Sequence, residues 1–190
     1  MTLKITGIIG LLLLIISRLL LMQGDAFIQS QAPFDFAHLF MLVGSLLCLA
    51  FCFVFPKSIF NSIAVPMIVL GVIAHCGMCA LDFTLWSFGA DEEGRNALVG
   101  HLMTSPKLWY PYFVIGPAFL YAGLTTQSWY FILRRTIASI IALSGGFAIG
   151  LGQMIWQNQL IVLAGTIALT IGFTWLLWPL NKIQEEAMQG

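Results

Sequence analysis

The chain has 190 residues, of which 59% are hydrophobic and 8% are charged, whereas soluble domains carry about 25% charged residues. Eight basic and eight acidic side chains are too few to cover a soluble globule, and their net charge of zero provides no basic surface for nucleic acid. The composition therefore predicts an integral membrane protein whose partner is the lipid bilayer, with no nucleic-acid partner.

Six apolar segments approach or exceed the length of about 20 residues that a helix needs to cross a bilayer. They cover residues 5–22, 37–55, 60–86, 108–125, 136–156 and 160–180. We therefore expect one polytopic domain over residues 1–190, an all-α bundle of six transmembrane helices with short loops. The first segment has an alternative interpretation as a cleaved signal peptide, because a short basic start precedes it and Gly24 lies among small residues. Its length and the charge of Arg18 favour a retained span.

Basic residues decide the orientation, because short loops rich in Lys and Arg stay in the cytoplasm. If six spans alternate, one end of the bundle carries Lys4, Lys57, Arg134, Arg135 and Lys182. We therefore predict that both termini are cytoplasmic and that the acidic loops after the first and third segments face outward. The short loops favour a bacterial plasma (inner) membrane.

Small residues recur at every fourth position in the last two segments. The stripes consist of Ala138, Ala142, Gly146 and Gly150, and of Ala164, Ala168 and Gly172. Helices in lipid associate through close backbone contact, so these stripes predict a tight antiparallel hairpin. The GxxxG pair of the first stripe alternatively predicts a homo-oligomer or a partner subunit bound through residues 136–156.

Two other segments have marked local signals. Pro111 and Pro117 each remove a backbone donor, which predicts a kink within residues 108–125. The loop over residues 87–107 contains an acidic run from Asp91 to Glu93 that is typical of a helix start. This loop helix is expected either to cover a pocket as a lid or to lie at the interface and seal the bundle.

Ionisable groups inside membrane spans are costly, so each is a candidate functional residue. His75 and Asp82 are seven residues apart, which places them on one helix face, and His38 and Ser45 share a face of the preceding segment in the same way. A rise of about 1.5 Å per residue puts most of these groups in the outer half of the membrane. We expect an outward-opening polar pocket on the first three spans. Its expected lining consists of Arg18, His38, Ser45, His75, Asp82 and His101.

Three functions are compatible with this pattern. The first is a small membrane protein that binds or passes a small solute or ion through the pocket, with Asp82 and His75 responding to protons or cations. An alternative is an oxidoreductase subunit in which His75, His38 and His101 hold haem or a transition metal, since imidazole is a common ligand. A second alternative is a non-catalytic assembly partner whose polar residues only join helices. No complete catalytic signature is present, so enzymatic activity and catalytic residues stay open.

The four cysteines include the pair Cys76 and Cys79 in a CxxC spacing. A lipid-embedded helix lacks the positive charge that activates such a pair, so we expect four apolar cysteines. Cys48 and Cys76 have the same expected depth, which leaves a disulfide or a soft-metal site as the alternative.

Overall fold

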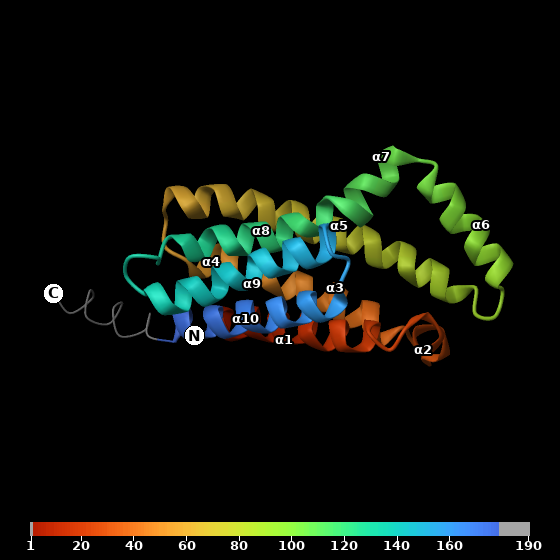
Figure 1. Cartoon of the computed structure of the whole chain (residues 1–190), viewed down its shortest axis with the longest axis horizontal. Coiled ribbons are helices and arrows are strands. Elements are labelled where there is room, and N and C mark those ends of the chain that lie inside the picture. Colours follow the sequence, from red (N-terminus) through yellow and green to blue (C-terminus); the bar gives the residue numbers. More distant parts are fainter. Residues whose placement is uncertain (1, 179–190) are drawn as a thin grey trace.

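The structure is a computed structural model that describes residues 2–178, and the helices of that range run mostly along one long axis (Figure 1). No strand occurs in this range. The helices are α1 (Thr2–Leu21), α2 (Asp25–Ser30), α3 (Phe36–Cys48), α4 (Phe51–Val54), α5 (Ile59–Ser87), α6 (Glu92–Met103), α7 (Pro106–Trp109), the π-helix η1 (Tyr110–Val114), α8 (Gly116–Trp129), α9 (Thr136–Met154) and α10 (Gln159–Leu177). The end of the last predicted segment and Lys182 lie outside the described residues.

Five helical segments of the described chain are long and apolar enough to cross a membrane. They are α1, α3 together with α4, α5, α9 and α10. The all-helical, membrane-type architecture is thereby confirmed. The remaining predicted span, residues 108–125, is divided among α7, η1 and α8, and α8 has only 14 residues. The six-span topology with cytoplasmic termini therefore stays a prediction.

The two prolines predicted to disturb residues 108–125 lie on either side of a change in helix type. Pro111 lies within η1, where the Ile115 N–H donates to the Tyr110 carbonyl five residues earlier at 2.9 Å. Pro117 lies in the first turn of α8, where a missing N–H breaks no helical hydrogen bond. The disruption thus takes the form of a π-helical turn followed by a new α-helix.

Helices α9 and α10 form the predicted antiparallel hairpin, and bare backbone lines their contact (Figure 1). A Cβ atom at Gly145 would lie 2.7 Å from the Gly165 carbonyl oxygen, and one at Gly172 would lie 2.7 Å from the Ala142 Cβ. These distances leave no room for a side chain at either glycine.

The hairpin contact uses only part of the stripes seen in the sequence, since Ala142 meets Gly172 but the rest of the contact runs through Gly145 and Gly165. Gly146 faces Thr125 of α8, and no described atom lies within 4 Å of a Cβ built at Gly150. Ala168 is half-buried, whereas its neighbour Leu169 is fully buried. A four-residue repeat drifts about 40° around the helix at each step because one turn takes 3.6 residues. The predicted GxxxG pair has therefore rotated out of the α9–α10 contact.

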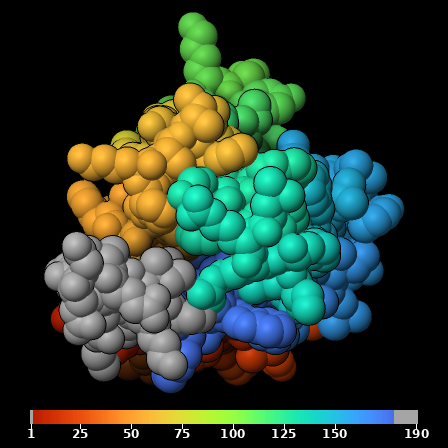
Figure 2. Space-filling view, turned by 90° about the vertical axis from the view of Figure 1, so that its left-hand side faces the viewer, coloured from red at the N-terminus to blue at the C-terminus, as the bar shows by residue number. Residues whose placement is uncertain are grey.

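Aromatic side chains and one amide close the end of the bundle near the N-terminus. The Phe51 ring lies 5.0 Å from that of Phe173, and the Phe55 ring lies 5.7 Å from that of Phe131. The Gln127 amide donates to the Phe51 carbonyl at 3.2 Å and to the Asn61 side-chain oxygen at 2.8 Å. Figure 2 looks onto this end, where the α4–α5 and α8–α9 connections lie side by side. The contacts tie α4, α5, α8 and α10 together.

Candidate functional site

A cavity of about 310 Å³ lies at the end of the bundle remote from the N-terminus, which we call the distal end. Figure 1 shows α2, the end of α5, and α6 projecting there beyond the other helices. The cavity, called the distal cavity below, lies among α2, the start of α3, the end of α5, and α6. Its lining consists of Asp25, Ile28, Gln29, Asp35, His38, Asp82, Leu85, Arg95, Asn96 and Val99.

Three of these side chains form a chain of contacts in the order Asp35, His38, Asp82, with a hydrogen bond between Asp35 and His38 and a charge contact between His38 and Asp82. Asp35 is the N-cap of α3 and accepts the His38 backbone N–H at 3.1 Å. Its second oxygen accepts the His38 Nδ1–H at 2.5 Å, and the other ring nitrogen, Nε2, lies 3.3 Å from an oxygen of Asp82 on α5. The side chain of Asp35 is 1% exposed, and those of His38 and Asp82 are 14% and 16% exposed. The chain thus joins the buried start of α3 to the partly open wall of the distal cavity.

The 3.3 Å contact between His38 Nε2 and Asp82 is close enough for the two groups to share a proton beyond the one that the neutral imidazole carries. Ionised carboxylates only accept hydrogen bonds, and a neutral imidazole carries a single N–H. That hydrogen is donated to Asp35, so a bond between Nε2 and Asp82 needs a second proton, carried by His38 or by Asp82. With one proton shared between Nε2 and Asp82, the chain carries one net negative charge.

Two arginines bring positive charge to this end of the bundle. Arg18, in the last turn of α1, is 7% exposed and acts electrostatically on both His38 and His75. Arg95 of α6 lies half-buried in the lining of the distal cavity. Arg18 thus acts directly on His38, whereas Arg95 adds positive charge to the cavity wall.

The structure separates the other predicted site residues from the distal cavity. His75 is fully buried, and its Nδ1–H donates to the Gly71 carbonyl at 2.8 Å. Ser45 is also buried, and its hydroxyl donates to the Leu42 carbonyl at 2.9 Å. His101 is exposed on α6. Of the six predicted residues, only His38 and Asp82 line the cavity. Arg18 does not line it but acts electrostatically on His38.

Asp35 is the member of the candidate site that sequence reasoning missed, because it lies in the acidic loop before α3 that was expected to face outward. The signal present in the sequence was the spacing of three residues between Asp35 and His38. An N-cap side chain accepts a hydrogen bond from the backbone N–H of the third residue of the helix that follows it, and that residue here is His38. The Asp-x-x-His pattern therefore brings a carboxylate to the imidazole.

The three histidines do not converge on a site for haem or a metal. Within residues 2–178, no group of three or more His, Cys, Asp and Glu residues could hold a metal ion. Both ring nitrogens of His38 face carboxylates, His75 is bonded to Gly71, and His101 lies apart on α6. All four cysteines are free, so Cys48 and Cys76 form no disulfide.

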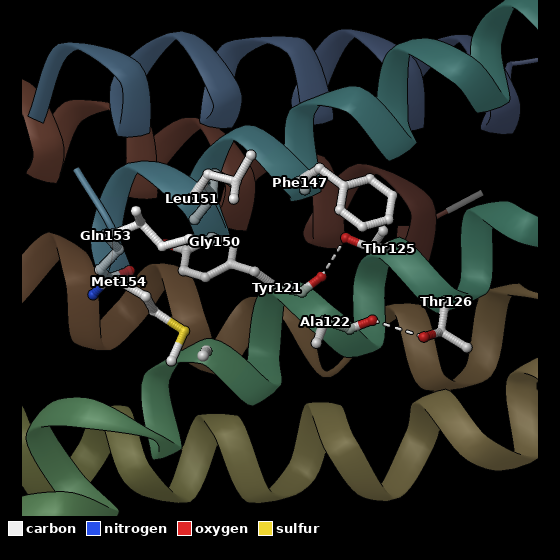
Figure 3. A pocket seen from close by; sticks show the side chains of 13 residues that line it. Tyr121, Ala122, Thr125, Thr126, Phe147, Gly150, Leu151, Gln153 and Met154 are labelled. Atoms are coloured by element: carbon white, nitrogen blue, oxygen red, sulfur yellow. Dashed lines mark hydrogen bonds between the residues drawn. The ribbon is translucent and has the colours of Figure 1, made fainter. Parts of the chain in front are cut away.

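A larger cavity, of about 530 Å³, lies between α8 and α9 and has a different character (Figure 3). Its lining is mostly apolar and includes small residues such as Ala122 and Gly150, and no charged residue lines it. The hydroxyls of Thr125 and Thr126 donate to carbonyls of their own helix, at 2.6 and 2.8 Å, as the dashed lines in Figure 3 show. The distal cavity is therefore the better candidate for polar chemistry.

No known protein family, curated protein or solved structure matches this chain.

Proposed function

We propose that this protein is a small multi-pass membrane protein whose distal cavity binds a small cationic solute or ion in exchange for a proton. The Asp35–His38–Asp82 chain in the cavity wall is the observation that supports the proposal. The chain places an exchangeable proton next to carboxylates in the wall of a cavity of about 310 Å³, which has room for a small solute. Histidine is the side chain whose ordinary pKa makes such an exchange effective near neutral pH.

The distribution of charge supports an outward-facing distal end. Acidic residues gather there together with Arg18, Arg95 and Lys107, whereas the opposite end of the bundle, near the N-terminus, carries basic residues and no acidic residue of the described range. The basic group consists of Lys4, Lys57, Arg134 and Arg135. By the positive-inside rule, that end belongs in the cytoplasm. The stretch from α7 through α8 covers residues 106–129, about 36 Å of helix, which is long enough for the sixth span of this topology.

The charges lining the distal cavity favour a cation. Asp25, Asp35 and Asp82 contribute three carboxylates, against the guanidinium of Arg95 and one proton on His38. Negative groups therefore outnumber positive groups by one. This excess of negative charge favours a cation over an anion, and charges withdrawn from water are stabilised by pairing with opposite charges.

Exchange at Asp82 keeps this balance unchanged. The incoming cation forms its contact with the Asp82 carboxylate while the bond between His38 Nε2 and Asp82 breaks. The shared proton leaves to water, and His38 stays neutral with its Nδ1–H donated to Asp35. One positive charge enters and one leaves, so the net charge of the cavity is constant.

Passage through the protein requires a second arrangement of the helices. Met41 and Ser45 on α3 and Cys79 on α5 follow His38 and Asp82 toward the cytoplasmic end, and all three side chains are buried. We therefore propose binding from outside as the first step of any passage.

Proton release on cation binding tests the proposal. The full chain in weakly buffered detergent solution is titrated with sodium, methylammonium, choline and magnesium, with binding followed by calorimetry and protons by an indicator dye. We expect at least one of these cations to bind and release about one proton. Asp82→Asn should weaken its binding by about tenfold or more, because the carboxylate partner is lost.

The controls use residues of the same type outside the cavity. Glu93→Gln on α6 should leave binding unchanged, since Glu93 does not line the distal cavity. His38→Gln should bind the cation with little proton release, whereas His101→Gln should behave as the unmodified protein. Absence of binding by all four cations, or equal proton release in Asp82→Asn, would contradict the proposal.

A further inference from the structure

Helix α6 is attached to the rest of the molecule by few buried side chains. Leu102 is its one buried residue. The helix begins just after Gly89, whose φ of +55° suits glycine and few other residues, and Asp91 caps it by accepting the Gly94 N–H at 2.9 Å. Figure 1 shows α6 running back at an angle to α5 at the distal end. The helix is thus well formed locally but only lightly fixed to its neighbours.

Arg95 lies one turn into this helix and faces carboxylates without pairing with them. It lines the distal cavity together with Asp25, Asp35 and Asp82, and it also lines an adjacent cavity of about 400 Å³ with Asp25 and Glu92. Its side chain forms no hydrogen bond or ion pair with any residue in the described range 2–178. A guanidinium close to several carboxylates but bonded to none of them is held nearby and remains displaceable.

We propose that Arg95 is a tethered cation that competes with the solute for the distal cavity and sets its preference for monovalent cations. The inference rests on the cation binding proposed above. When no solute is bound, the guanidinium neutralises part of the carboxylate charge. A cationic solute must overcome repulsion from Arg95, and a divalent cation experiences twice the repulsion of a monovalent one.

The other charges around His38 stay in place when Arg95 is changed. They are Asp35 at the start of its own helix, Asp82 from α5, Asp25 from α2 and Arg18 from α1. Substitution of Arg95 therefore isolates the contribution of α6 to the charge of the cavity.

A charge series at residue 95 tests the inference. Dissociation constants for methylammonium and magnesium are measured in the full chain and in Arg95→Lys, Arg95→Gln and Arg95→Glu. Removal of the charge should tighten methylammonium binding by about fivefold and magnesium binding by about 25-fold, because the electrostatic energy doubles with the charge of the ligand. Arg95→Glu should exceed both gains, and Arg95→Lys should stay near the unmodified protein.

Arg134→Gln, at the opposite end of the bundle, is the matched control and should change neither constant. A change that only damaged the fold would weaken binding, so a gain in affinity separates the electrostatic role from a structural one. Equal affinities across the series, or weaker binding in Arg95→Gln, would overturn the role of Arg95 and leave the cation site standing. If neither cation binds to any of these proteins, the role of Arg95 is overturned, and the cation site itself is contradicted only if sodium and choline also fail to bind.

Discussion

The α9–α10 hairpin and the distal cavity are built on opposite principles. In the hairpin, Gly145 and Gly165 bring two backbones together and no polar side chain is needed. At the distal cavity, Asp35, His38 and Asp82 meet across helices that leave a space of about 310 Å³ between them. Close backbone packing stabilises helices in lipid, where apolar burial offers no driving force, whereas a binding site needs room and charge. We therefore expect substitutions in the hairpin to affect stability and substitutions at the distal cavity to affect binding, largely independently of each other.

The largest effect on stability is expected at the centre of the hairpin. Gly145→Leu would place a Cβ 2.7 Å from the Gly165 carbonyl oxygen and force α9 away from α10. We expect a loss of about 3 kcal/mol or more of unfolding free energy, measured by thermal or denaturant unfolding in detergent. Gly150→Leu is the matched control, because no described atom lies within 4 Å of its Cβ position. Equal losses in the two variants would show that the α9–α10 contact does not depend on bare backbone.

A smaller loss is expected where a side-chain amide joins helices at the other end of the bundle. Gln127→Leu keeps the size of the side chain but leaves the Phe51 carbonyl and the Asn61 amide without their shared donor. We expect a loss of about 1–2 kcal/mol by the same unfolding measurement. Thr126→Val should cost less, because the Thr126 hydroxyl bonds only within its own helix. An unchanged midpoint in Gln127→Leu would mean that the amide contributes nothing across α4, α5 and α8.

The smallest effect on stability is expected at Asp35, together with a clear effect on proton exchange. Asp35→Ala removes the cap of α3 and should cost about 1 kcal/mol. Asp35→Ser can still cap the helix, so its stability should stay within about 0.5 kcal/mol of the unmodified protein. Both variants remove the carboxylate partner of His38 and should reduce proton release on cation binding. Full proton release in Asp35→Ser would contradict the role given to the chain.

The membrane architecture could be predicted from the sequence because it depends on the length of apolar segments. Five of the six predicted segments correspond to helices long enough to span a membrane. The break at Tyr110–Val114 was signalled by Pro111, but its π-helical form depends on where the freed carbonyls find donors. Composition and periodicity fix which segments enter the membrane, but not how an irregular turn satisfies its backbone.

The candidate site was harder to predict because it combines residues from loops and separate helices. His38 and Asp82 were found as ionisable groups within apolar segments. Asp35 and Arg95 lie in the connections, where charged residues are common and carry no such signal. His75 was misleading because the Gly71 carbonyl of its own helix satisfies its Nδ1–H. Side-chain partners within one helix and across a loop are decided by three-dimensional contacts.

The length of α5 bears on where the distal cavity lies relative to lipid. The helix has 29 residues and is therefore about 43 Å long, some 13 Å longer than the hydrocarbon core of a typical bilayer. If this excess length lies at the distal end, the final turns, which carry Asp82, would reach the layer of lipid headgroups and interfacial water. A thicker bilayer would draw His38 and Asp82 toward hydrocarbon, and an anionic lipid surface would enrich both protons and cations beside them. The thickness of the bilayer and the charge of its headgroups would then influence how the site binds protons and cations.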